Sequence, residues 1–125
     1  MIESWLIDDG STAPVSLETV LEVLQARIGR GQLETWLSSS SGRALAVVTN
    51  TERAMVMLLE EEGDPGEHAV DPGANGSSEG FMLASGQHDE YPNEDTVPIG
   101  EAFRIVDHIV SKGSWPPDAR WVADR

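Results

Sequence analysis

The residues with the most chemical potential are three histidines set among many carboxylates. His88 is followed directly by two acids, and His68 stands three positions before Asp71. Imidazole and carboxylate groups bind divalent metals, but neither spacing matches a usual zinc or calcium site. His108 falls on the polar side of an expected helix. We therefore expect no bound metal and no other cofactor.

Nucleophilic catalysis has little support in the sequence. Cysteine is absent, which removes thiol catalysis, disulfides and cysteine-based zinc sites. Four serines stand in a row at 38–41, but no Gly-x-Ser-x-Gly motif surrounds any serine, so the run is interpreted as a turn. Phosphate loops and dinucleotide-binding glycine motifs are also missing. The sequence predicts a protein that binds rather than catalyses.

The balance of charge is strongly negative. The 125 residues include 22 Asp and Glu against 8 Lys and Arg, a net charge of −14, and no Lys or Arg lies between Arg53 and Arg104. Repulsion from phosphates disfavours direct binding to nucleic acid or to anionic membranes, whereas a basic protein would be attracted. The alternative is a solvated surface that only keeps the protein soluble.

Acidic residues in two segments and one tryptophan are the candidate partner-binding residues. One segment follows the apolar run 53–59 and contains the turn Gly63–Gly66, and the other lies in the connection 87–96. Trp115 stands beside two prolines and is expected to be partly exposed, as interface anchors often are. The full set is Glu60, Glu61, Glu62, Asp64, Glu67, Asp89, Glu90 and Trp115. Trp36 and Trp121 are instead expected to cover the core or the sheet.

Two segments have helical spacing of their apolar residues. Residues 16–31 begin at Ser16, a suitable N-cap, and end at two glycines; residues 97–113 have Pro98 in the first turn and a glycine at the end. Each carries one apolar stripe, made by Leu17, Val20, Leu21, Leu24 and Ile28 in the first and by Ile99, Ala102, Phe103, Val106 and Val110 in the second.

The remaining apolar runs are typical of short strands. They are residues 2–7, 33–38, 44–49, 53–59, 68–70, 80–85 and 120–122. The runs 44–49 and 53–59 are joined by a short polar turn, which predicts an antiparallel hairpin. A helix is the alternative for residues 53–62, because Met, Leu, Ala and Glu favour helices. Residues 87–96 are expected to form an acidic connection.

These elements predict one α+β domain over residues 1–125. We expect a mainly antiparallel meander with both amphipathic helices packed on one face of the sheet. No apolar run approaches the roughly 20 residues of a membrane span, and the N-terminus lacks the basic and apolar parts of a secretory signal. A cytoplasmic location is therefore expected.

The C-terminal part carries a series of short motifs. Val97-Pro98, followed by Ala102, opens an apolar helix, and Trp121 stands five residues after Pro116. Upstream, an apolar strand leads into the acidic turn at residues 61–66. This series resembles the Imm-one family of immunity proteins from bacterial polymorphic toxin systems.

The resemblance implies a binding protein that neutralises a cognate toxin, often a nucleic-acid deaminase or nuclease, and that has no catalytic residues of its own. Such a toxin needs a cationic cleft for its substrate, and an acidic face can occupy that cleft. Residues 60–67 would make the main contact, assisted by Asp89 and Glu90. Two alternatives stay open: an acidic interaction domain unrelated to toxins, and a small hydrolase with an unrecognised site.

Overall fold

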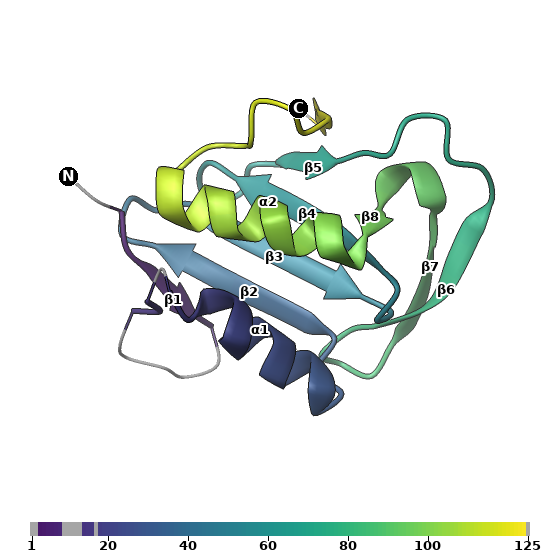
Figure 1. The fold of residues 1–125 in the computed structure, drawn as a ribbon, viewed down its shortest axis with the longest axis horizontal. Coiled ribbons are helices and arrows are strands. Elements are labelled where there is room, and N and C mark those ends of the chain that lie inside the picture. Colours follow the sequence, from purple (N-terminus) through teal and green to yellow (C-terminus); the bar gives the residue numbers. More distant parts are fainter. Residues whose placement is uncertain (1–2, 9–13, 17, 125) are drawn as a thin grey trace.

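The computed structural model describes residues 3–8, 14–16 and 18–124 (Figure 1). In chain order the elements are β1 (Trp5–Ile7), α1 (Val20–Gly29), β2 (Glu34–Ser39), β3 (Ala44–Thr49), β4 (Arg53–Leu59), β5 (Glu67–Ala69), β6 (Ser77–Met82), β7 (His88–Pro92), the 3₁₀ turn η1 (Asn93–Asp95), β8 (Val97–Pro98), α2 (Ile99–Lys112) and β9 (Trp121–Ala123).

The main sheet is an antiparallel meander that the C-terminal strand completes. Its order is β1-β2-β3-β4-β5-β9, and β8 pairs with the first residues of β4. Since β3 occupies one edge of β4 along its length, β8 and β5 follow one another along the other edge. Strands β6 and β7 form a separate two-stranded hairpin.

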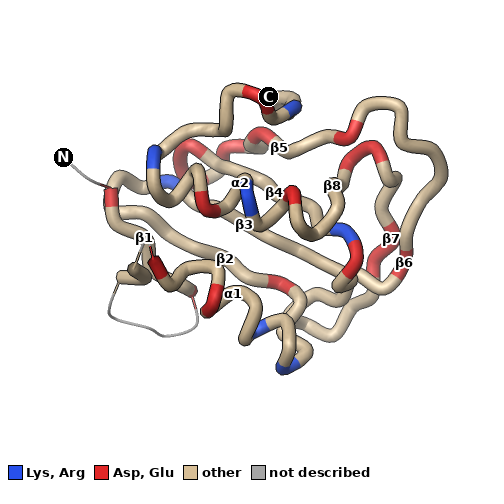
Figure 2. Tube along the Cα trace, in the orientation of Figure 1, with Lys and Arg blue, Asp and Glu red and all other residues tan. Residues whose placement is uncertain are grey.

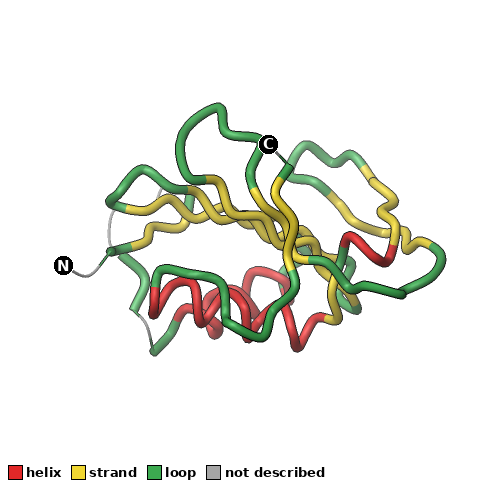
Figure 3. Tube along the Cα trace, turned by 90° about the horizontal axis from the view of Figure 1, so that it is seen from above, coloured by secondary structure: helices red, strands yellow, loops and turns green. Residues whose placement is uncertain are grey.

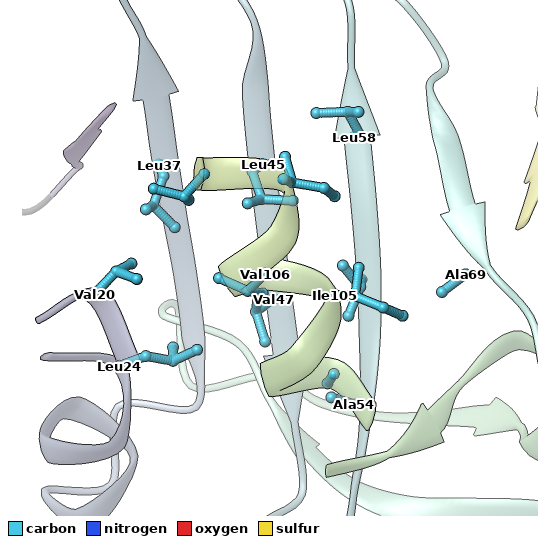
Figure 4. Packing of buried hydrophobic residues seen from close by; sticks show 14 of the residues in the cluster. Val20, Leu24, Leu37, Leu45, Val47, Ala54, Leu58, Ala69, Ile105 and Val106 are labelled. Carbon is cyan, nitrogen blue, oxygen red and sulfur yellow. The ribbon is translucent and has the colours of Figure 1, made fainter. Parts of the chain in front are cut away.

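Both helices pack on the same face of the sheet, as the sequence predicted (Figure 3). The core face of α2 consists of Ala102, Ile105, Val106, Ile109 and Val110, and it meets Leu45 and Leu58 of the central strands (Figure 4). The predicted stripe is therefore wrong in part: Ile105 and Ile109 were not predicted, and Ile99 and Phe103 are only partly buried at its border. Fully burying an aliphatic side chain of this size contributes about 1.5–3 kcal/mol. This layer is the hydrophobic core.

The ends of the helices follow local chemistry. Gly113 has φ +81° at the C-terminus of α2, and its N–H donates to the carbonyl of Ile109, which closes the helix as expected. Helix α1 is shorter than predicted, because it begins at Val20 rather than at Ser16. The hydroxyl of Ser16 accepts the N–H of Glu18 and so forms a turn before the helix. The predicted stripe residue Leu17 lies outside the described residues.

The β6–β7 hairpin covers one end of the opposite face of the sheet. Phe81 of β6 is completely buried and meets Tyr91 of β7 edge-on, with ring centroids 4.9 Å apart. Two hydrogen bonds dock the hairpin: the Glu34 carboxylate accepts the N–H of Ala84 at 2.8 Å, and the Asn50 side chain donates to the Glu79 carbonyl at 2.9 Å. At this end the sheet is therefore covered on both faces.

The prediction for residues 87–96 is wrong in part, because residues 88–92 form β7. Its sequence, His-Asp-Glu-Tyr-Pro, lacks the apolar alternation of a strand; pairing with β6 decides its conformation. Residues 53–59 are a strand, which removes the helical alternative. Within the described residues, neither helix has the length and apolar composition needed to cross a bilayer.

Candidate functional site

One row of side chains runs across the helix-free face of the sheet. In the strand register, Trp36 lies opposite Ala46, which lies opposite Met57, then His68, then Val122. Residues opposite one another in antiparallel strands share a face, and sequence neighbours point the other way. Because neighbouring residues such as Leu37, Leu45 and Leu58 belong to the helix-side core, these five face away from the helices. We call them the open row.

The open row is apolar at its centre and accessible towards its ends. Ala46 is buried; Trp36, Met57 and His68 are half-buried; and Val122 is 43% exposed. The indole N–H of Trp36 donates to the Glu34 carboxylate at 3.0 Å, which ties an aromatic ring to an acid on the same face. Aromatic and methionine side chains are enriched where proteins meet proteins.

Acidic segments flank the open row on its two long sides, one towards each end of β4. The loop at residues 60–66, here called the acidic loop, rises from the helix-free side after β4, and the β6–β7 hairpin, here called the acidic hairpin, covers the other end (Figure 3). Glu61 and Glu62 line a depression together with Ala44 and Leu59, two residues of that same sheet face. At the other end, Glu79, His88, Asp89 and Glu90 line a second depression.

Two of the four carboxylates of the acidic loop keep their charge available. Glu61 and Glu62 are exposed and form no ion pair with any described residue. Glu60 lies 3.7 Å from an Arg43 nitrogen, and its backbone N–H donates to Asp64 Oδ2 at 2.9 Å, which closes the turn. The loop therefore presents two carboxylates to solvent beside the open row.

The acidic hairpin is held together by neutral donors. Asp89 accepts hydrogen bonds from the Tyr91 hydroxyl at 2.8 Å and from the Gln87 amide at 2.7 Å, and Glu90 accepts one from the Ser77 hydroxyl. Burial, and then the hydrogen bond to Asp89, raise the pKa of Tyr91 to about 12. Since none of these donors carries a charge, the hairpin keeps its negative potential (Figure 2).

Arg53, the first residue of β4, is already engaged. Its guanidinium lies 2.6 Å from Asp71 Oδ2 and donates to the carbonyls of Asn93 and Thr96 and to the Thr96 hydroxyl. These bonds tie the start of β4 to η1 and to the loop after β5. The cation is neutralised locally and does not offset the acidic hairpin.

Glu67 and Trp115 lie on the helix side, away from the open row. Glu67 is opposite Leu58, and its carboxylate accepts the indole N–H of Trp115 at 2.9 Å. Trp115 is only 9% exposed and belongs to the core cluster, so the prediction of a partly exposed anchor is wrong. Trp121, which was predicted to cover the core or the sheet, does stack on Trp115 of the core cluster but remains 42% exposed.

The reason for this exchange is topological. After α2 ends at Gly113, the two prolines that follow Trp115 keep the chain from resuming a helix, and it returns along the outer edge of the sheet as β9. Trp121 stacks on Trp115, with ring centroids 5.9 Å apart and an angle of 11° between the planes. The inner ring is thereby covered by the outer one, which keeps one face towards solvent.

The structure thus divides the predicted residues among three places. The acidic loop holds Glu60, Glu61, Glu62 and Asp64; the acidic hairpin holds Asp89 and Glu90; and the helix side holds Glu67 and Trp115. The first two groups stand at opposite ends of β4 and flank the same sheet face. Sequence reasoning missed Met57, His68 and Val122, because only the strand register aligns them.

His68 clamps three segments together. Its Nδ1 lies 2.8 Å from Asp124 Oδ2, beyond β9, and its Nε2 lies 3.0 Å from Asp95 Oδ1 in η1. Burial by itself lowers the pKa of His68, but the hydrogen bonds to Asp124 and Asp95 outweigh it, so the pKa is raised above 6.5. The imidazole therefore fastens β9 to the sheet.

The histidines among the described residues do not assemble a metal centre. No group of three or more His, Asp or Glu in that part of the chain is arranged to hold a metal ion. Each ring nitrogen of His68 is hydrogen-bonded to a carboxylate, His88 is exposed on β7, and His108 contacts the carbonyl of Ser114. What the geometry provides is a sheet face with an apolar centre and carboxylates on two sides.

No family model matches the sequence, and no curated protein matches it.

Proposed function

We propose that this protein is a non-catalytic immunity protein that binds and neutralises a basic toxin domain, a nucleic-acid deaminase or nuclease. The observation that carries the proposal is the open row, an apolar strip between two groups of carboxylates with Arg53 already paired to Asp71. The resemblance of the C-terminal motifs to the Imm-one family supplies the toxin class.

The physical division of labour follows from interface energetics. The half-buried indole and thioether of Trp36 and Met57 can be desolvated cheaply against an apolar patch, which gives affinity. The carboxylates of the acidic loop and acidic hairpin speed association with a cationic surface and set its orientation. Once seated, they exclude a phosphate backbone from the toxin's cleft without any covalent step.

The direct experiment is titration against the toxin domain encoded beside this protein's gene. The double variant Glu61→Lys/Glu62→Lys should slow association and make the association rate less dependent on salt. The binding free energy should weaken by about 1 kcal/mol if these carboxylates stay exposed at the rim, and by about 2–5 kcal/mol for any carboxylate that is buried on binding. Met57→Glu, which places a charge in the centre of the open row, should weaken binding further.

A matched control changes the same charge on the helix side. Glu22→Lys/Asp107→Lys alters two acids on α1 and α2 and should leave the affinity unchanged apart from the general loss of steering. If the control and loop variants weaken binding equally, the open face is not the contact surface. If the neighbouring protein binds but is not toxic to cells, the chain is an acidic interaction domain of another kind.

A further inference from the structure

Strand β9 is the unprotected edge of the main sheet. Trp121 and Val122 are the exposed large hydrophobic residues among those described, and both lie on this outermost strand. Natural sheets shield such edges because the unpaired backbone groups accept another strand. Here two large apolar side chains stand beside an edge that no described strand covers.

The hydrogen bonds of β9 show which backbone groups are left over. The Val70 N–H donates to the Arg120 carbonyl, and the Asp124 N–H donates to the Gly66 carbonyl. Residues of an antiparallel strand alternate in direction, so Arg120, Val122 and Asp124 point their backbone groups towards β5. The N–H and carbonyl groups of Trp121 and Ala123 therefore point outward.

The sequence of this edge is complementary to itself. In an antiparallel pair centred on Val122, Arg120 of one chain lies opposite Asp124 of the other, and Trp121 lies opposite Ala123. By symmetry, the pair has two contacts between opposite charges and two contacts in which Trp121 packs beside the small Ala123. In the same register the outward groups of Trp121 and Ala123 face each other and can form four backbone hydrogen bonds.

We propose that β9 pairs with β9 of a second copy and joins two sheets into one continuous sheet with two-fold symmetry. Such an interface is isologous, because the same residues serve on both sides. Pairing also sets Val122 against Val122, so that the open row runs without a break from one copy into the other. This inference does not depend on the toxin-binding proposal.

Two charged groups near the edge agree with a second copy rather than a basic strand. Arg120 would be repelled by a cationic segment, whereas Asp124 of a second copy neutralises it. His68 engages Oδ2 of Asp124, and an ionised carboxylate has a second oxygen that can accept from Arg120. The net charge of −14 on each copy and the short strand make the dimer weak and dependent on concentration.

Sedimentation analysis of the full chain over micromolar to millimolar concentrations tests this proposal. The mass should rise from 13.5 kDa towards twice that value. Arg120→Asp and Asp124→Arg, each alone, should shift dimerisation to at least tenfold higher concentration, because like charges then lie opposite. An equimolar mixture of the two variants should recover it, because each Asp again meets an Arg.

A backbone variant keeps the proposal falsifiable if Asp124→Arg does not fold. Ala123→Pro removes an outward N–H and leaves the inward bonds of its neighbours, so it should remain folded by circular dichroism and stay monomeric. Val122→Thr changes a side chain on the same strand but keeps every backbone N–H, so this control variant should still dimerise. A wild-type chain that remains monomeric at millimolar concentration, or an Ala123→Pro dimer as tight as the wild type, overturns the proposal.

Discussion

Arg43 grips the carboxylate of Glu3 with two nitrogens of its guanidinium: Nε donates to Oε2 at 3.0 Å, and Nη2 donates to Oε1. The same Nη2 donates to the carbonyl of Gly113 at 2.8 Å, and the guanidinium lies 5.6 Å from the centre of the Trp5 ring. Residues that are 40 and 70 positions from Arg43 in the sequence thus meet at one side chain. This contact joins the N-terminal strand, the β2–β3 turn and the end of α2.

Replacing Glu3 should loosen all three segments at once. We expect Glu3→Gln to lower the free energy of unfolding by about 1–2 kcal/mol, since it leaves the Arg43 cation without its carboxylate. Urea denaturation at pH 7 measures this. Glu18→Gln, an exposed change before α1, is the control and should stay within about 0.5 kcal/mol of the wild type.

The same pair predicts a loss of stability in acid. The hydrogen bond from Arg43, opposed by burial, lowers the pKa of Glu3 from 4.5 to about 2. A lowered pKa stabilises the fold fully above pH 4.5, and the contribution disappears as the pH falls towards 2. The stability difference between wild type and Glu3→Gln should therefore shrink over that range. A constant difference between pH 6 and pH 2 would contradict the assignment.

His68 should show the opposite dependence. Its pKa is raised above 6.5, so its protonated form stabilises the fold fully below pH 6.5, and this contribution is lost as the pH rises through the folded-state pKa. His68→Gln should destabilise the protein more at pH 6 than at pH 9. The amides of β9 should exchange hydrogen faster in this variant, whereas the exposed His88→Gln should leave them unchanged.

Two glycines allow a steric effect to be separated from a backbone effect. Gly66 and Gly63 both have positive φ, of +92° and +83°, in the acidic loop. A Cβ on Gly66 would lie 3.1 Å from the Leu58 carbonyl oxygen, whereas a Cβ on Gly63 would meet nothing within 4 Å. Both alanine variants should lose about 1 kcal/mol from the left-handed backbone, and Gly66→Ala should lose more. Equal losses in denaturant midpoints would show that the loop relaxes.

Local patterns in the sequence account for the fold class and for most of the elements. The existence of α2, the buried runs at 44–49 and 53–59 and the closing glycine at 113 could be predicted, because burial on one side imposes a fixed period on neighbouring residues. The exact core face of α2 could not, since Ile105 and Ile109 are buried outside the predicted stripe. Strand β7 was not predicted, because its residues lack that period and its conformation depends on pairing with β6.

The acidic character of the segments beside the open row was also contained in the sequence, since charge can be counted along the chain. Which acids flank one surface was decided by the tertiary structure: the acidic loop and the acidic hairpin share the helix-free face, whereas Glu67 turns to the other side and binds Trp115. The open row, the exposure of Trp121 and the burial of Trp115 have the same origin. They depend on the register of strands far apart in the sequence, and that register is set by packing across the sheet rather than by any residue's immediate neighbours.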